Sequence, residues 1–136
     1  MTDQDQPGAS VRDLGESSPP SGWEAEDLLR IDAAETSTAV VLSLHGELDA
    51  TTAPPLRQRL AEAVADERRL VVDATGLSFC GSSGLRLFLD VHRWAKERRG
   101  ELRIVVRPGS SLERVVDVVG LNRVLPITSE LATALG

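Results

Sequence analysis

The stretch that sets the fold reads LVVDATGLSFCGSSGL over residues 70–85. Its opening run, Leu70–Ala74, is short and apolar, which predicts a buried strand. Residues 75–81 contain two glycines and a serine, which predict a loop. From Ser82 to about Arg98 the apolar residues recur at helical spacing, which predicts an amphipathic helix. Strand, loop and helix in this order form the repeating unit of a parallel sheet.

The same patterns continue on both sides of this unit. Prolines at positions 54 and 55 suit the first turn of a helix, where a missing N–H costs little. Residues 110–113, SSLE, form a capping box that opens a further helix, and glycines at 100 and 120 suit helix ends. The other predicted elements are strands at Leu28–Ala34, Thr38–His45, Glu101–Arg107 and Val124–Ile127, and helices over residues 54–64, 110–120 and 130–135.

This alternation of strands and helices predicts the α/β class. Helical crossovers between strands make most of the sheet parallel, whereas the opening hairpin adds an antiparallel edge. The chain has 136 residues, a length that fits one domain. We therefore predict a single domain over residues 28–136, with helices packed against a mixed, mostly parallel sheet.

The net charge of −6 belongs to one end of the chain. Residues 1–27 hold seven acidic side chains and one arginine, whereas residues 28–136 are electrically neutral. Because residues 1–22 are rich in Ser, Pro, Gly and Asp, we expect residues 1–27 to be a disordered acidic leader. A neutral domain with an acidic leader argues against nucleic acid as a partner, and against an anionic membrane surface.

The cysteine content and hydropathy point to the cytoplasm. Cys80 is the single cysteine, so no internal disulfide and no cysteine metal cluster can form, as is usual in a reducing compartment. No apolar stretch is long enough to cross a bilayer, and the N-terminus lacks the apolar core of a secretory signal.

Two segments lie where a site is expected. In α/β sheets, sites form at the carboxyl ends of the strands. Residues 45–52 follow the second predicted strand and residues 75–84 follow the third. If these two strands are parallel neighbours, Glu47 and Asp49 face Gly81, Ser82 and Ser83.

The residues argue against catalysis. The run CGSSG at 80–84 lacks the Gly-x-Ser-x-Gly spacing of a nucleophile elbow, and no phosphate-binding glycine loop occurs. His45 and His92 are the only histidines, and we interpret His92 as a hydrogen-bonded core residue on the apolar side of a helix. Asp73 is expected to hydrogen-bond the turn at Thr75–Ser78. No spacing suits a metal, no cofactor is indicated, and we predict that the protein is not an enzyme.

Ser82 has two interpretations at the start of the long helix. As an N-cap, its oxygen would accept an N–H of the first turn. The same place also suits a phosphate, because the amino end of a helix presents free N–H groups and partial positive charge. A phosphoserine here would add charge to an exposed loop without melting the fold.

Residues 71–85, together with Gly46-Glu47-Leu48-Asp49, resemble the two motifs of the STAS family of anti-sigma-factor antagonists. The resemblance extends over about residues 28–135, and the predicted order of elements agrees with the family fold. It implies a protein that binds an anti-sigma factor, itself a serine kinase, and thereby releases a sigma factor.

The resemblance also implies a switch. Ser82 occupies the position of the family's phosphoacceptor, whose phosphate abolishes binding until a serine phosphatase removes it. Ser83 is the second candidate acceptor, with a hydrogen bond to the first helical turn as its alternative role. Gly81 stands where the family has an aspartate. This departure keeps two alternatives open, a phosphorylation-independent scaffold and a module that senses a small ligand, and a homodimer is also left open.

The expected partner surface combines three segments. They are the loop over residues 46–52, the turn over residues 81–84, and the outer edge of the helix that follows. Trp94 has packing against a neighbouring helix as an equally weighted alternative. The expected contact residues are Glu47, Asp49, Thr51, Gly81, Ser83, Gly84, Arg86, Leu87 and Trp94.

Overall fold

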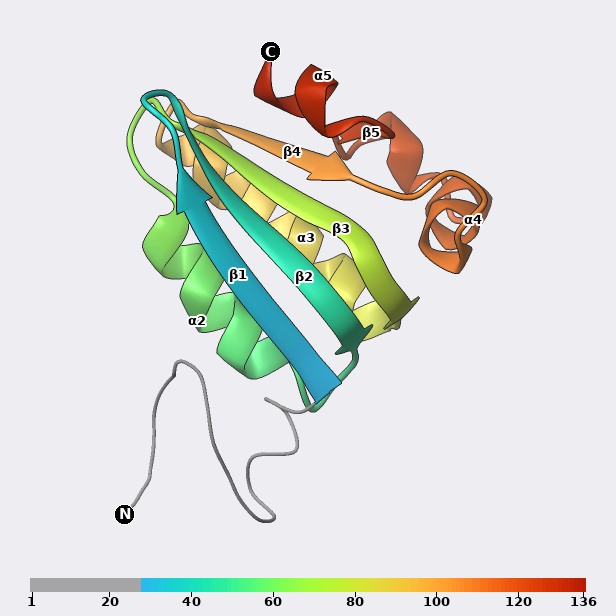
Figure 1. The fold of residues 1–136 in the computed structure, drawn as a ribbon. Helices are drawn as coiled ribbons and strands as arrows, with labels where there is room; N and C mark the ends of the chain where they lie inside the picture. Colours follow the sequence, from blue (N-terminus) through green and yellow to red (C-terminus); the bar gives the residue numbers. More distant parts are fainter. Residues whose placement is uncertain (1–27) are drawn as a thin grey trace, which may run out of the picture.

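The computed structural model describes residues 28–136, and the predicted disordered leader at residues 1–27 lies outside the described residues. A five-stranded sheet organises this part of the chain, with strands in the order β1-β2-β3-β4-β5 (Figure 1). The strands are β1 (Leu29–Glu35), β2 (Ala39–Leu48), β3 (Arg69–Cys80), β4 (Glu101–Val105) and β5 (Ile127–Thr128).

The pairing directions confirm the predicted mixed sheet. β1 and β2 form the antiparallel hairpin, and β2, β3, β4 and β5 follow one another in parallel. Each parallel connection passes through helical structure, as the α/β class requires. The connecting elements are α2 (Ala53–Ala63), α3 (Ser82–Glu97), α4 (Ser111–Val118) and the 3₁₀ turn η1 (Leu121–Arg123), and α5 (Leu131–Leu135) ends the chain.

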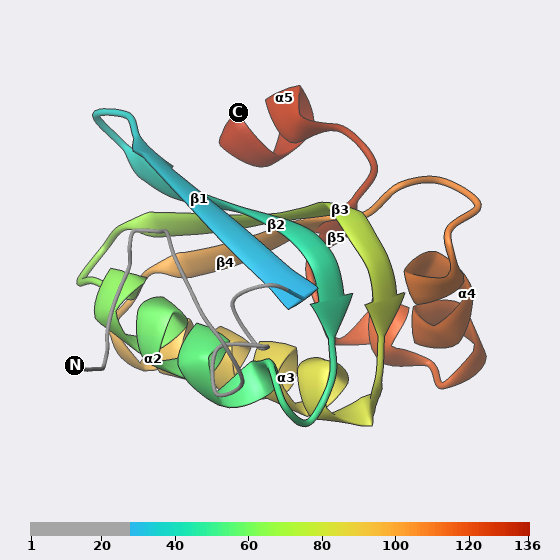
Figure 2. The same ribbon diagram turned by 60° about the horizontal axis from the view of Figure 1, so that its bottom comes forward.

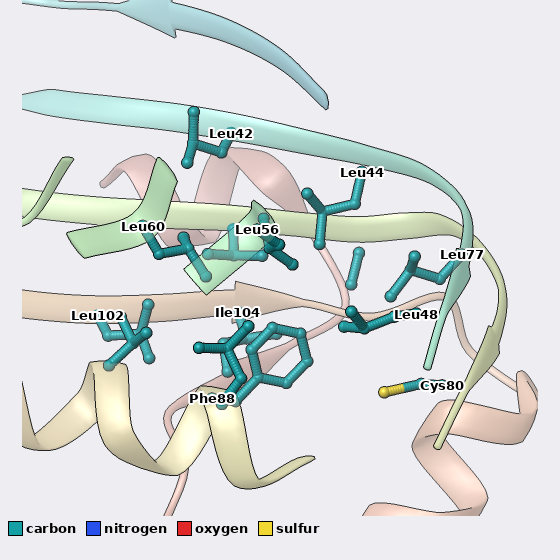
Figure 3. Close-up of a cluster of buried hydrophobic side chains, with 14 of the residues drawn as sticks. Leu42, Leu44, Leu48, Leu56, Leu60, Leu77, Cys80, Phe88, Leu102 and Ile104 are labelled. Atoms are coloured by element: carbon teal, nitrogen blue, oxygen red, sulfur yellow. The ribbon is translucent and has the colours of Figure 1, made fainter. Parts of the chain in front are cut away.

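One face of the sheet carries the main core. Helices α2 and α3 lie side by side across this face (Figures 1 and 2). Leu42 and Leu44 of β2 point toward Leu56 of α2 and Phe88 of α3, and all four side chains are buried (Figure 3). Because side chains alternate along a strand, every second residue of β2 contributes to this layer.

The opposite face is covered only in part. Val41, Val71 and Val105, from three neighbouring strands, form a second, smaller cluster with Ala134 of α5. Arg69 donates a hydrogen bond of 2.7 Å to the carbonyl of Leu135, which ties α5 to the sheet. Helix α5 lies toward one end of the strands, and the carboxyl ends of β2 and β3 extend beyond it (Figures 1 and 2).

Two predicted elements are wrong. Residues 75–80 belong to strand β3 instead of a loop, because β2 continues alongside them and pairs as far as Leu48 with Cys80. The predicted strand Val124–Ile127 is mostly the irregular segment after η1, and only Ile127–Thr128 pairs with β4.

The predicted helix ends are largely confirmed. Ser110 caps α4 by accepting the N–H of Glu113, and Gly120 adopts a left-handed φ of 79° at its end. At the end of α3 the left-handed residue is Arg99 (φ 58°) instead of Gly100. Glycine is required at 100 for a different reason, since a Cβ there would lie 2.4 Å from the carbonyl oxygen of Arg68. No helix among the described residues has the length and apolar character to span a membrane.

Phe88→Ala tests the main core. The ring is almost fully buried between sheet and helices, so its removal leaves a cavity and should lower the free energy of unfolding by about 3–5 kcal/mol. Urea denaturation measures this loss. Val118→Ala, at a side chain that is 79% exposed, is the control and should change stability by less than about 0.5 kcal/mol. Equal effects of the two substitutions would contradict this core.

Candidate functional site

The carboxyl ends of β2 and β3 lie side by side, as the sequence predicts. Glu47 pairs with Phe79 and Leu48 with Cys80, at the last positions of the parallel register. The N–H of Gly81 then donates a hydrogen bond of 2.9 Å to the carbonyl of Leu48. The turn after β2 and the start of α3 therefore leave the sheet from adjacent points (Figure 1).

The turn after β2 is held by its own polar side chains. The Oδ1 atom of Asp49 accepts the N–H groups of Thr51 (2.9 Å) and Thr52 (3.1 Å). The hydroxyl of Thr52, a residue that is 0% exposed, donates to the carbonyl of Glu47 (2.8 Å) and accepts the N–H of Asp49 (2.9 Å). Asp49 thus shapes the turn, while Glu47 and Thr51 are exposed.

Helix α3 begins one residue earlier than a Ser82 cap would require. Gly81 is the N-cap and provides no side chain, so Ser82 and Ser83 are the first two helical residues. Helix geometry leaves their N–H groups without an acceptor inside the helix, and these groups form its positive end. Ser82 is exposed and Ser83 half-buried, and neither hydroxyl has a hydrogen-bond partner within residues 28–136. The expected bond from Ser83 to the first turn is wrong.

Gly84 brings the start of α3 close to the sheet. A Cβ at this position would lie 2.7 Å from the Sγ of Cys80 and equally close to Leu48. Gly84 is buried and acts in packing, which corrects its expected place on the partner surface. Burial also raises the pKa of the Cys80 thiol to about 12.

Leu87 is placed differently from the prediction. Its side chain is 0% exposed and belongs to the main core, so it offers no surface to a partner. The physical reason is the position of α2, which packs beside α3 and covers the flank that a single helix would expose. Arg86, one residue earlier, is exposed as expected.

Trp94 lies at the junction of α2 and α3. Its half-buried ring packs against the core, and the Arg57 guanidinium lies 5.5 Å from the ring centroid. Arg57 also donates a hydrogen bond of 2.8 Å to Asp90, and this bond lowers the pKa of the Asp90 carboxyl. A shallow groove of about 480 Å³ runs along this junction, lined by Pro54, Arg57, Gln58, Ala61, Glu62 and Trp94.

The other polar side chains considered in the sequence, Asp73, His45 and His92, lie outside the turn after β2 and the start of α3. Asp73 accepts both the N–H (3.0 Å) and the hydroxyl (2.7 Å) of Thr75, as expected, although Thr75 belongs to strand β3 and the predicted turn is absent there. His45 lies 3.5 Å from Asp32 on the neighbouring strand. The buried Nδ1 of His92 has no hydrogen-bond partner among residues 28–136, which contradicts the expected hydrogen-bonded histidine, and burial lowers the pKa of His92. Within residues 28–136 no three acidic, histidine or cysteine side chains are arranged to hold a metal.

Phe79 is a site residue that the sequence reasoning missed. Its side chain is 50% exposed beside Glu47 and two positions before Gly81. A Cβ at Gly81 would lie 3.3 Å from the Cε2 atom of this ring. Strict alternation from Leu70 and Val72 would place Phe79 on the outer face of a strand, but the prediction of a loop over residues 75–81 hides this signal.

Thr52→Val tests the turn after β2. The substitution keeps the shape but removes the hydroxyl, leaving the part-buried N–H of Asp49 and the carbonyl of Glu47 without this partner. We expect a loss of about 1–3 kcal/mol in the free energy of unfolding, measured with urea. Thr51→Val, at an exposed neighbour, should have little effect, and equal losses would show that the Thr52 bonds do not hold the turn.

The reactivity of the Cys80 thiol tests whether the start of α3 stays packed against the sheet. A buried thiol with a raised pKa carries little thiolate at pH 8, so iodoacetamide should alkylate the native protein far more slowly than the urea-unfolded chain. Mass spectrometry follows the reaction. Similar rates in the two states would mean that the start of α3 opens readily.

Comparisons with known proteins agree with this geometry. The anti-sigma-F factor antagonist RsfB of Mycobacterium tuberculosis is 32% identical over 115 residues, which cover 82% of this chain and 90% of that protein. The anti-sigma-B factor antagonist of Bacillus subtilis is 28% identical over 105 residues, covering 75% and 93%. The crystal structure of an anti-sigma factor antagonist from Mycobacterium paratuberculosis superposes with a TM-score of 0.72 at 29% identity, covering 80% of this chain and 92% of that one.

The family match covers most of the described residues. Residues 31–127 match the family described as Mlab, STAS domain. This range runs from β1 to β5 and includes both segments of the site. The chain therefore belongs to the STAS domain family.

Proposed function

We propose that this protein is an anti-sigma-factor antagonist whose binding to a serine-kinase anti-sigma factor is switched off by phosphorylation of Ser82. Binding of the unphosphorylated protein would release the sigma factor, and a serine phosphatase would restore it. The protein would act as a binding module, not an enzyme, in the cytoplasm, where ATP supplies the phosphoryl group. The names and the extensive coverage of the two bacterial relatives support this class of function.

The observation that carries the proposal is the position of Ser82. It is the exposed first residue of α3, at the carboxyl ends of two parallel strands, and its hydroxyl is not engaged by residues 28–136. A kinase can therefore reach the hydroxyl without unfolding the helix. The free N–H groups of the first turn favour a phosphate there by about 0.3–1 kcal/mol.

The switch then acts at the interface. Phosphorylation adds about −1.5 to −2 charges to a surface that already carries the exposed carboxylate of Glu47. A partner that covers Ser82 must remove water from this phosphate, which costs several kcal/mol unless a cation compensates. Binding weakens although the fold is unchanged.

The proposed partner surface follows the observed positions. Glu47, Thr51, Gly81, Ser82 and Ser83 lie at the same end of the sheet, and Asp49 sets the turn between the first two. Arg86 and the exposed part of Trp94 extend the surface along α3.

One observation favours a second function, a scaffold that binds without phosphorylation. Gly81, directly before Ser82, has no side chain, so this position offers no carboxylate that a kinase could use to orient Ser82. Its neighbour is the ring of Phe79. A constitutive antagonist would use the same surface with no switch.

Intact mass after incubation with ATP and the organism's anti-sigma kinases tests the acceptor. The wild-type protein should gain about 80 Da, the mass of one phosphoryl group, and Ser82→Ala should gain nothing. The control Ser83→Ala should still be modified. A gain by Gly81→Asp but not by the wild type would favour the scaffold.

Ser82→Asp tests the switch separately. It should weaken binding at least about tenfold, or 1.4 kcal/mol, while the melting temperature stays nearly constant. Ser111→Asp is the matched control, because Ser111 is also the exposed first residue of a helix. Titration on a biosensor surface measures both affinities, and equal affinities would contradict a switch at Ser82.

A further inference from the structure

Two register shifts in the β2–β3 pair decide which way Phe79 points. Ser43 pairs with Asp73 but His45 with Gly76, and Gly46 pairs with Leu77 but Glu47 with Phe79. Each shift places an extra residue in β3, which is a β-bulge. The extra residue of the second bulge is Ser78, whose hydroxyl donates a hydrogen bond of 3.1 Å to the carbonyl of Gly46.

The second bulge turns an aromatic side chain out of the core. With the first bulge in place but without Ser78 as an extra residue, Phe79 would pair with Leu48, which points into the main core, because a one-residue shift moves a side chain to the other face. With the bulge, the small Cys80 takes this inward position instead. Phe79 is 50% exposed and belongs to neither apolar cluster of the described residues.

The ring of Phe79 lies close to Ser82, the proposed phosphoacceptor. Phe79 lies beside the exposed Glu47 on β2, and its ring edge lies against the backbone of Gly81. Ser82 is the next residue along the chain. Any surface that removes water from the ring therefore also approaches the hydroxyl of Ser82.

We propose that Phe79 is the apolar anchor through which this protein binds its anti-sigma factor, seated in an apolar recess of that partner beside Ser82. The inference rests on the proposed function and names the chemistry of the partner surface. A few buried aromatic side chains often carry most of the energy of an interface. A dry recess around Phe79 also makes a phosphate on Ser82 costly, so one feature supplies both affinity and switching.

The local charge favours a different protein over a second copy of this chain. In a two-fold dimer through this patch the same surface meets itself, and the two Glu47 carboxylates approach each other around the axis. Like charges facing each other across an interface oppose association. A partner of different sequence avoids this repulsion.

Titration of variants against the organism's purified anti-sigma factors, each immobilised on a biosensor surface, tests the anchor. Phe79→Ala should weaken binding at least about tenfold, or 1.4 kcal/mol, without lowering the melting temperature. Phe79→Leu keeps an apolar side chain and should retain affinity within about threefold. Leu131→Ala, at a 38% exposed side chain on α5, is the matched control and should bind like the wild type.

The outcomes separate this inference from the proposed function. If the wild type binds none of the anti-sigma factors, the proposed function fails and the anchor with it. If the wild type binds and Phe79→Ala binds equally well, only the anchor is wrong. Sedimentation of the free proteins gives a third outcome: a dimer that Phe79→Ala dissociates, with unchanged affinity for the partner, would overturn the anchor and assign the patch to self-association.

Discussion

The parallel pairing of β2 with β3 is the constraint on which the rest of the molecule depends. It runs from Ala39 opposite Arg69 to Leu48 opposite Cys80, and Gly81 prolongs it with one more hydrogen bond to Leu48. Both strands are central, so their apolar residues supply the middle of the core. Because the pairing continues to the last residue of each strand, it also fixes where the turn at Asp49 and the helix at Ser82 begin.

Close packing at the end of this pair explains how the site is built. Gly84 lets the first turn of α3 approach Cys80 and Leu48, and the Asp49–Thr52 hydrogen bonds hold the neighbouring turn. The side chains of Asp49 and Thr52 are therefore engaged in structure. Ser82 is different, since its hydroxyl is exposed and unengaged among the described residues, which suits a group that reacts or binds.

The two bulges in the β2–β3 pair also determine which side chains of β3 reach the surface. The first bulge alone would leave Phe79 directed inward, whereas the extra residue Ser78 of the second bulge returns it to the surface beside Glu47. Burial of a phenylalanine contributes about 1.5–3 kcal/mol, so a fold optimised for stability alone would place this ring inside. The proposed binding role of the exposed ring would account for this loss of core stability.

The sequence by itself determined the order of elements, the α/β class, the charge difference between residues 1–27 and the domain, and the exposed serine at the start of α3. Helical periodicity, the Ser110 cap and the Gly120 end depend on residues within about four positions of one another, so the pattern is readable along the chain. The tertiary structure alone decided the length of β3, the positions of its two bulges and the burial of Leu87. Each of these depends on residues about thirty positions away, namely on β2 for the strand and its bulges and on α2 for Leu87. A local sequence pattern does not show which distant strand or helix will pack against a given residue. That packing sets the register of β3 and the burial of Leu87.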